Sequence, residues 1–408
     1  MSFSEKLREA IKNMKMVDLR SGFKILGTVI VRELHRLVSR PIYILCLIVA
    51  PLISCIFLLT LMDKGLPERL PTAVVDLDHS TASRNFIRQL NSLSLIQVVE
   101  QPNSFTEARE SLQRGQIYGF LVIPESFEAK AMAGRQPELS FYTNNGYYIP
   151  GALLYKGFKT MSVLASGAIV QQTLLAHGQY GYEITPKLQP IVPDVHALGN
   201  PWLNYSVYLN NTFIPGMLQL LILLTTVFSI GSEIKHGTSR EWLAKSHNSI
   251  ILAITGKLLP QTVIFFVVGA LCQSLLYGYW HFPLHNGIWP MLSAMLLLVI
   301  ASQSYAVIMM SIAPSLRIGL SMAGLFGIIS ISITGFSFPV PAMYSPFRLL
   351  TNIFPLRHYF LIYADQALNG IPLYYSRIQY LALFLFALAS LPLLPRLKKA
   401  LQRQIYVP

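Results

Sequence analysis

The sequence predicts an α-helical integral membrane protein with six transmembrane helices and a mixed α/β extracytoplasmic domain inserted between helices 1 and 2. The chain is 53% hydrophobic and only 12% charged, whereas soluble domains carry about 25% charged residues. Six apolar stretches are long enough to cross a bilayer, whose core of about 30 Å takes about 20 helical residues. Residues 63–211 are more polar and separate the first stretch from the other five.

The apolar stretches are expected to be helices because lipid offers backbone amides no hydrogen-bonding partner. The alternative, a set of buried helices in a large soluble protein, is disfavoured by the number of such stretches in one chain. In order along the chain, the predicted spans are Ile42–Met62, Phe213–Ile230, Leu258–Trp280, Ile288–Ile312, Ile318–Phe336 and Ile378–Leu394.

The basic residues predict the orientation, because loops rich in Lys and Arg stay in the cytoplasm. Such residues are dense in residues 1–41, between spans two and three, and in the tail 396–408, whereas the turn His281–Gly287 has none. Both termini are therefore predicted to be cytoplasmic. The net charge of +13 indicates membrane anchoring and excludes nucleic-acid binding as its purpose. The basic flanks comprise Lys6, Arg8, Lys12, Lys15, Arg20, Lys24, Arg32, Arg36, Arg40, Lys235, Arg240, Lys245, Arg396, Lys398, Lys399 and Arg403.

Nothing in the sequence indicates a cofactor or an enzymatic site of the chain's own. All the cysteines, Cys46, Cys55 and Cys272, lie in predicted spans, which excludes a disulfide framework in the inserted domain. No Cys/His cluster suggests a metal. Gly256-Lys257 lacks the upstream glycine and the following Ser or Thr of a phosphate-binding loop, so no ATP site is expected.

The inserted domain alternates strand and helix signals, which implies crossover connections and a small, mostly parallel sheet. Ser80 is expected to cap the first of its helices. Ser104 and Glu107 have the spacing of a capping box. The predicted strands are Leu70–Asp76, Leu95–Val99, Tyr118–Ile123 and Glu138–Tyr142, and the predicted helices cover 81–90, 105–114 and 151–176.

An amphipathic helix is predicted over Gly22–Arg40, just before the first span. Its apolar stripe predicts a helix lying in the membrane interface. Two interpretations stay open, a plain anchor and a contact surface for a partner. The stripe consists of Phe23, Leu26, Ile30, Leu34 and Leu37 or Val38, and Arg32, Glu33, Arg36 and Arg40 fall largely elsewhere.

The loop 231–248 predicts a short helix-turn-helix on the cytoplasmic side. Gly237 can end one helix and Thr238 can cap the next. Glu233 lies where the apolar sequence ends, and a carboxylate at a membrane boundary is costly unless it is paired or hydrated. Glu233 is therefore expected to have a basic or amide partner.

Residues 337–377 predict a re-entrant segment at the outer surface. Pro339 and Pro341, just beyond Gly335, break any helix there. The rest of this segment is too long for a tight turn and too interrupted for a span, and irregular backbone at membrane depth requires protein or water around it.

The chain resembles the permease subunits of ABC-2 type exporters, in the subgroup with a large extracytoplasmic domain between transmembrane helices 1 and 2. Val31–Pro41 (VRELHRLVSRP) resembles the family's interfacial elbow helix, and Gly231–Leu243 (GSEIKHGTSREWL) its E-x-x-x-G-T-x-x-x-x-L loop. Ile333–Met343 with Asn352–Gly370 resembles the re-entrant outer segment and the final outer stretch. Ser232 departs from the family, because many relatives carry a basic residue there.

The resemblance implies a separate ATP-binding subunit, which holds ATP and Mg, and no cofactor in this chain. It also implies a second permease, as a homodimer or with a paralogue, because one set of six helices offers half a pathway. The residues implied in coupling to the ATPase are Arg32, Glu33, Glu233, Lys235, Gly237, Thr238, Arg240 and Glu241. The residues implied in an outer gate, for which aromatic anchoring is the alternative, are Gly335, Phe336, Phe338 and Pro339.

The expected function is export of a hydrophobic or amphipathic substrate across the bacterial cytoplasmic (inner) membrane. Membrane lipid is an expected partner, and a periplasmic adaptor a further one. One alternative is an ATPase-coupled sensor or mechanotransmitter. Another is a secondary transporter driven by an ion gradient, which requires intramembrane ionisable residues and internal repeats. The predicted spans are almost bare of charge and no repeat is evident.

Overall fold

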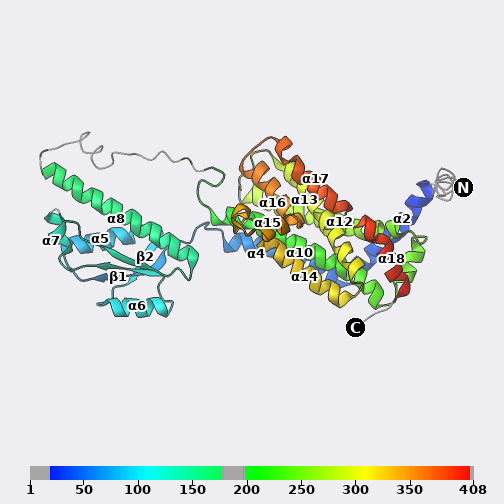
Figure 1. Cartoon of the computed structure of the whole chain (residues 1–408), viewed down its shortest axis with the longest axis horizontal. Coiled ribbons are helices and arrows are strands. Elements are labelled where there is room, and N and C mark those ends of the chain that lie inside the picture. Colours follow the sequence, from blue (N-terminus) through cyan, green and yellow to red (C-terminus); the bar gives the residue numbers. More distant parts are fainter. Residues whose placement is uncertain (1–18, 134, 177, 179–195, 197, 405–408) are drawn as a thin grey trace. The chain divides into compact units, whose positions relative to one another are not determined.

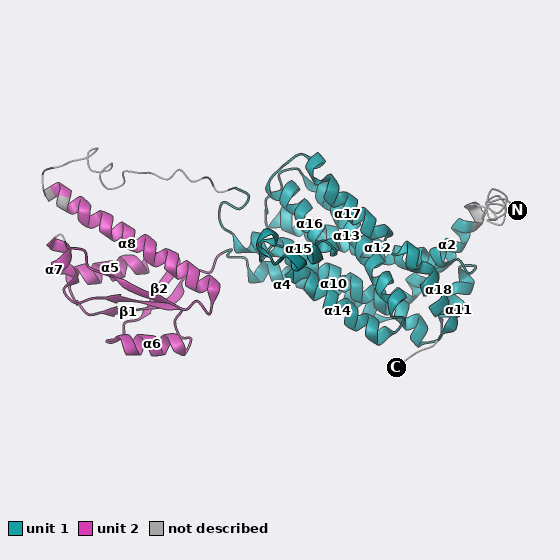
Figure 2. Cartoon of the chain, in the orientation of Figure 1, with its two compact units in different colours: residues 1–65, 197–408 teal, residues 66–196 magenta. Residues whose placement is uncertain are grey.

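The computed structural model describes residues 19–133, 135–176, 178, 196 and 198–404 (Figure 1). The chain divides into two compact units (Figure 2), Met1–Gly65 with Ala197–Pro408, here the helical unit, and Leu66–His196, here the α/β unit. The most N-terminal basic residues on which the predicted orientation rests, Lys6, Arg8, Lys12 and Lys15, lie outside the described residues.

The helical unit begins with α2, which covers the predicted interfacial helix. Short π-helical segments, Leu45–Val49, Leu275–Tyr279 and Ala364–Leu368, continue three of its helices without a break. Its α-helices are α2 (Leu19–Ser39), α3 (Pro41–Ile44), α4 (Ala50–Leu61), α10 (Tyr205–Lys235), α11 (Ser239–Lys245), α12 (Ile250–Ser274), α13 (Ile288–Ile312), α14 (Leu316–Ser332), α15 (Ser345–Thr351), α16 (Pro355–Tyr363), α17 (Arg377–Leu388) and α18 (Leu394–Arg403).

Five helical stretches of the described chain are long and apolar enough to cross a membrane, and each matches a predicted span. The sixth prediction, Ile318–Phe336, falls on α14, which has 17 residues and is about 26 Å long, less than the hydrocarbon core. Helix length therefore supports five spans and one shorter apolar helix. The five are Pro41–Leu61, Tyr205–Lys235, Ile250–Tyr279, Ile288–Ile312 and Leu373–Arg403.

Two apolar clusters form the core of the helical unit. The larger one joins α4, α10, α12, α13 and α16 around side chains such as Phe265 and Leu298, which are 0% exposed. The second lies between α10, α11, α12 and α18, with Trp242 and Leu397 equally enclosed. The second cluster anchors the short α11 against the bundle.

Helices α10 and α14 run antiparallel and approach each other closely along the whole of α14. Glycine provides the space at four levels, from α10 at the two outer levels and from α14 at the two inner ones. A Cβ added at each of these glycines would lie only 2.5–2.8 Å from an atom of the facing helix: Gly216 from Ile331, Gly327 from Leu220, Gly319 from Val227 and Gly231 from Leu316. Pro215, just before the first of them, lies inside α10, where proline removes a helical hydrogen bond.

The α/β unit is a four-stranded sheet in the order β2-β1-β3-β4, with helices on both faces (Figure 1). Strands β1 (Leu70–Asp76), β2 (Ile96–Glu100) and β3 (Gly119–Ile123) are parallel, and β4 (Ser140–Thr143) pairs antiparallel with β3. The small, mostly parallel sheet is thus confirmed. Side chains of α5 (Thr81–Asn91), α7 (Phe127–Met132) and α8 (Tyr148–Ala176) pack on one face and those of α6 (Phe105–Gln113) on the other.

The predicted caps of this unit are confirmed, one of them with a shift. Ser80 Oγ accepts from Ser83 N at 3.0 Å, as expected for the cap of α5. Ser104 Oγ accepts from Glu107 N at 3.3 Å, but the Glu107 carboxylate accepts from Asn103 N at 3.1 Å and not from Ser104. The capping box therefore closes one residue earlier than its usual form. Helix α7, which begins after Ser126 in the left-handed conformation, has no counterpart in the prediction.

Candidate functional site

Helix α2 is held against α12 by a close contact at Gly256. A Cβ on Gly256 would lie 2.8 Å from the Cβ of Val29, so only glycine admits α2 this closely. Glu33 and Leu37 follow Val29 at four-residue intervals and share its face of α2. All three are buried. The contact therefore places a carboxylate, Glu33, inside the helical unit.

Glu233, near the end of α10, is the acceptor at the centre of a buried ion-pair network. Arg32 Nη1 and Nη2 donate to its two carboxylate oxygens at 2.8 and 3.1 Å, which is the bidentate geometry that arginine favours. Arg36 Nη1 and Thr238 Oγ1 also donate to this carboxylate. Lys257 Nζ, from α12, donates to Glu233 Oε1 at 2.9 Å.

Lys257 joins the two carboxylates of the network. Its Nζ also donates to Glu33 Oε2 at 2.7 Å, and it lies 4.7 Å from the centre of the Trp242 ring, a cation–π contact. The other oxygen of Glu33 accepts from Ser229 Oγ at 3.1 Å and from Gln261 Nε2 at 3.2 Å. Three helices, α2, α10 and α12, are thereby connected through one ammonium group.

The network holds three cations, Arg32, Arg36 and Lys257, and two carboxylates, and it is shielded from solvent. The side chains of Glu33, Glu233 and Lys257 are 1%, 0% and 0% exposed, and those of the arginines 12–13%. Burial by itself raises the pKa of the Glu33 carboxyl, but the charges of Lys257 and Arg36 outweigh it and hold that pKa below its usual value. The surroundings of Glu33 thus favour its ionised form.

The expectation that Glu233 has a basic partner is confirmed, and four of the predicted coupling residues meet here: Arg32, Glu33, Glu233 and Thr238. The others do not join the network. Lys235, Arg240 and Glu241 are exposed. Arg240 Nε donates to the backbone oxygen of Gln402 at 2.9 Å, and Glu241 pairs with Lys245 at 2.8 Å.

Three local predictions have different outcomes: Gly237 ends α10 as predicted, Thr238 lies at the predicted N-cap position without capping, and the predicted face of Glu33 is wrong. Gly237 follows His236, the C-cap residue of α10, and has φ +70°, the left-handed conformation in which glycine ends helices. Thr238 is the N-cap residue of α11, but its side chain makes no cap bond, because its hydroxyl donates to Glu233. The sequence pattern puts Glu33 off the apolar face of α2, yet it lies on the face that packs into the bundle.

Sequence reasoning missed Lys257, Arg36 and Gln261 as members of the site. The available signal was a single charged residue, Lys257, in the otherwise apolar helix Ile250–Ser274. The predicted span begins at Leu258, which puts Lys257 outside it, whereas the helix begins two turns earlier.

A basic groove of about 590 Å³ opens beside this network, between α2 and α11. Arg32, Arg36 and Thr238 line the groove and belong to the network, so the groove adjoins it directly. Glu241 is its only carboxylate among the residues that the structure describes. The remaining lining residues are Thr28, Val31, His35, Ser39, Arg40 and Lys245.

The predicted gate residues lie at the opposite end of α10. Tyr208 Oη donates to the backbone oxygen of Phe336 at 2.6 Å, and the Phe336 ring meets that of Phe213 edge-on at 5.4 Å. Gly335 has φ +104°, and a Cβ there would lie 2.8 Å from Val340. Phe338 stands apart from these rings and is 53% exposed.

The segment after these residues is broken into short helices. Pro339 precedes a 3₁₀ turn, Val340–Ala342, and α15 and α16 follow. Arg357 Nη1 donates to the backbone oxygen of Thr334 at 2.9 Å, which ties α16 to the end of α14. Burial lowers the pKa of Arg357.

Comparison with known proteins identifies a family and a relative. The family model described as "ABC-2 family transporter protein" matches residues 41–394. The "Linearmycin resistance permease protein LnrN" of Bacillus subtilis (strain 168) is 32% identical over 109 residues, which are 27% of this chain and 28% of that protein. The match therefore spans only about a quarter of that relative. Because the family model covers both spans that flank the α/β unit and all helices of the network except α2, the chain belongs to the ABC-2 transporter family as a membrane-spanning permease.

Proposed function

We propose that this chain is the permease subunit of an ATP-driven ABC-2 type exporter, coupled to a separate ATP-binding subunit. The observation that carries the proposal is the basic groove beside the buried Glu33–Lys257–Glu233 network. A subunit seated in it touches α2 and α11 directly and is linked to α10 through Arg32 and Arg36, which pair with Glu233. Lys257 extends this link to α12. Movement of that subunit then displaces α2, α10 and α12 together. ATP and Mg belong to the partner.

The groove has the chemistry of a protein-docking surface. Arg40, His35 and Lys245 lie at its rim, outside the buried network. Short α11, anchored by the buried Trp242, gives the groove a firm wall. Charge complementarity steers association, so the partner is expected to present acidic side chains here.

The proposed pathway forms between two permeases, as a homodimer or with a paralogue, with Gly335, Phe336, Phe338 and Pro339 at its outer gate. We propose that α14 is the sixth span and that the spans cross the bacterial inner membrane. Both termini then lie in the cytoplasm and the α/β unit lies outside. Phe338, which is half-exposed, suits a surface that meets a second copy. An apolar gate fits a hydrophobic or amphipathic substrate, and a periplasmic adaptor would contact the α/β unit.

An ion-gradient-driven transporter has one observation in its favour, the buried Lys257 within a candidate span. Such a transporter uses ionisable residues near the middle of the membrane. Lys257 instead lies two turns from the start of α12, beside the groove, and both carboxylates it contacts are already paired. The network therefore fits coupling to a partner better than ion transport. In the sensor alternative, the same docking would occur without passage of a substrate.

Purification in mild detergent from the native host tests the docking. We expect an ATP-binding subunit to accompany the wild-type chain. The double charge reversal Arg40→Glu/Lys245→Glu should reduce its recovery about tenfold or more, because like charges across an interface cost several kcal/mol. The matched control is Arg109→Glu/Arg114→Glu, at two exposed positions in and just after α6 of the α/β unit. Equal recovery with both double variants would place the partner on another surface.

Coupling is tested with Glu233→Gln and Gly237→Pro in proteoliposomes that contain the partner. Glu233→Gln removes the charge that holds Arg32 and Arg36, and Gly237→Pro is incompatible with φ +70° because proline fixes φ near −65°. We expect substrate transported per ATP hydrolysed to fall about tenfold, in the usual range of coupling energies, with membrane insertion retained. Arg109→Gln, at an exposed position of the α/β unit and outside the predicted coupling residues, is the control. An unchanged transport ratio in both variants would contradict the coupling role, and ATP hydrolysis without any transport in the wild type would favour the sensor.

A further inference from the structure

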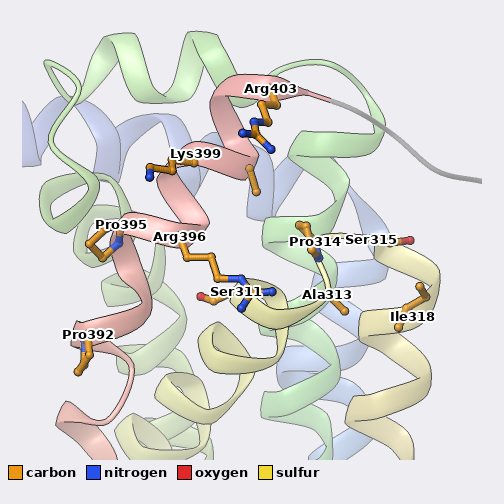
Figure 3. A pocket seen from close by; sticks show the side chains of 11 residues that line it. Ser311, Ala313, Pro314, Ser315, Ile318, Pro392, Pro395, Arg396, Lys399 and Arg403 are labelled. Atoms are coloured by element: carbon orange, nitrogen blue, oxygen red, sulfur yellow. The ribbon is translucent and has the colours of Figure 1, made fainter.

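A second pocket, of about 720 Å³, opens at the end of the helical unit where α13 ends and α14 begins (Figure 3). Ser311, Pro314 and Ser315 form the side that belongs to this turn, and Ile318 lies on the first turn of α14. The opposite side is α18, with Pro392 just before it. Neither the coupling groove nor the predicted gate includes any of these residues.

The wall formed by α18 is cationic. Arg396, Lys399 and Arg403 follow one another at spacings of three and four residues, so they share one face of the helix. All three line the pocket, and no Asp or Glu is among its described lining residues. Within the described chain, none of the three takes part in an ion pair. Arg396 Nη2 donates to the backbone oxygen of Ile312, at 3.3 Å.

The rest of the pocket and its surroundings are apolar. Pro314, Ile318 and Pro392 line it. Ile312, Ile318 and Leu391 are each about half-exposed, at 49%, 51% and 49%. Two candidate spans, Ile288–Ile312 and Leu373–Arg403, end at this level. Apolar side chains next to cations at the end of a span mark the depth at which lipid acyl chains give way to headgroups.

We propose that this pocket binds an anionic phospholipid. The phosphate group lies among Arg396, Lys399 and Arg403, and the first part of an acyl chain runs along Ile318, Ile312 and Leu391. Phosphate is the shared chemistry of lipid headgroups and of soluble phosphates. The apolar strip below the cations distinguishes them, because a soluble phosphate gains nothing from it. The N-terminus of α14, which carries the positive end of its helix dipole, also attracts the phosphate. The proposal does not depend on transport or on the ATPase subunit.

The test uses the full chain in nanodiscs of phosphatidylcholine with a few per cent of headgroup-labelled phosphatidylglycerol as the probe. The variant is Arg396→Gln/Lys399→Gln/Arg403→Gln. Because a basic residue near the membrane surface contributes roughly fivefold in affinity, we expect a loss of about a hundredfold in phosphatidylglycerol affinity. The control, Lys235→Gln/Arg317→Gln/Lys398→Gln, removes the same charge from positions outside the pocket and should lose much less. Equal losses in the two variants would overturn the proposal in favour of non-specific attraction to the surface.

A second variant separates lipid from soluble phosphate and does not touch the cations. Ile318→Ser should lower phosphatidylglycerol affinity severalfold, because it places a polar group against the acyl chain, and it should leave competition by free glycerol 3-phosphate unchanged. Competition by glycerol 3-phosphate as strong as that by the lipid would overturn the lipid assignment. Thermal unfolding of all three variants at the wild-type temperature shows that any loss is one of binding and not of folding.

Discussion

Replacing Lys257 with Met should destabilise the helical unit by about 3–5 kcal/mol, the usual cost of removing one partner from a buried ion pair. The ammonium group lies 2.7 Å from Glu33 and 2.9 Å from Glu233 and is fully buried. Glu233 keeps its arginines in the variant, but Glu33 is left with the neutral donors Ser229 and Gln261. Thermal unfolding of the purified chain in detergent measures the effect.

The double variant Glu33→Gln/Lys257→Met is the control for this prediction. It removes both charges and should recover much of the lost stability, because replacing a whole buried pair is often neutral. A double variant as unstable as the sum of the single variants would show that the two groups do not interact.

The pH dependence of Lys257→Met provides a further check. Without Lys257, only the charge of Arg36 and the hydrogen bond from Ser229 still oppose the effect of burial, so we expect the pKa of Glu33 to rise above its unfolded value. A raised carboxyl pKa gives stability that is present while the group is protonated and is lost as the pH rises through the folded pKa. The difference in the free energy of unfolding between Lys257→Met and the wild type should therefore become smaller on acidification towards about pH 5, close to the range where glutamate protonates.

Replacing Gly119 with Val should unfold the α/β unit while the helical unit stays intact. A Cβ at Gly119 would lie 2.8 Å from the backbone oxygen of Tyr142 and 3.0 Å from Leu154. Tyr142 belongs to the strand paired with β3, so its oxygen cannot retreat without loss of the β3–β4 pairing. Overpacking of this kind costs about 1–3 kcal/mol and occasionally more, a large part of the stability of a small domain.

Hydrogen exchange resolved along the chain measures this effect, with fast exchange expected in 66–133 and 135–176 and wild-type rates in α10–α14. Gly167→Val, in α8, is the matched control, since nothing lies within 4 Å of a Cβ there. Protection of β1 and β3 at wild-type levels in Gly119→Val would contradict the prediction.

The secondary structure of the α/β unit was largely predictable, because its signals are local. The run LPTAVVD is the strand Leu70–Asp76 to the residue, and Ser80 caps the next helix as its position indicated. The antiparallel pairing of β4 was not predictable, because strand direction depends on the path of the connection through α7, a six-residue helix without a clear periodic signal.

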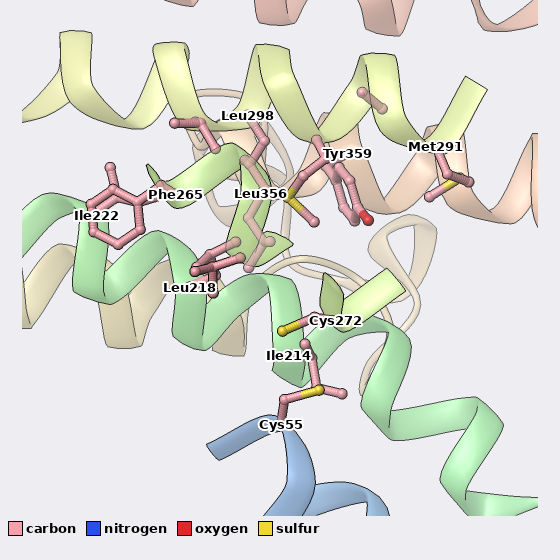
Figure 4. Close-up of a cluster of buried hydrophobic side chains, with 14 of the residues drawn as sticks. Cys55, Ile214, Leu218, Ile222, Phe265, Cys272, Met291, Leu298, Leu356 and Tyr359 are labelled. Carbon is pink, nitrogen blue, oxygen red and sulfur yellow. The ribbon is translucent and has the colours of Figure 1, made fainter. Parts of the chain in front are cut away.

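The spans were predictable from apolarity, but their packing was not. Helices such as α12 and α13 are apolar on all sides, so the sequence does not distinguish a face toward lipid from a face toward protein. Figure 4 shows side chains of α10, α12, α13 and α16 meeting in one apolar cluster, among them Leu218, Phe265, Leu298 and Tyr359. That convergence depends on contacts between distant parts of the chain.

In the candidate site, too, one part was predictable from the sequence and another part was not. The need of Glu233 for a partner follows from the cost of burying a lone carboxylate. The identity of the partners does not, since Arg32 is 201 residues away in the sequence. Lys257 is only 24 residues from Glu233, but its role becomes visible only once α12 is known to begin at Ile250.

The glycine-lined contact between α10 and α14 has a mechanical consequence. Interlocked at four levels, the two helices cannot slide past each other, so an axial shift imposed at Glu233 travels through α14 to its far end at Ser332 almost undiminished. Pro215 weakens α10 just beyond the last of these levels, which lets the first turns of that helix lag behind. The strain then falls on the hydrogen bond from Tyr208 Oη to the backbone oxygen of Phe336. We expect this bond to break first when α14 shifts along α10.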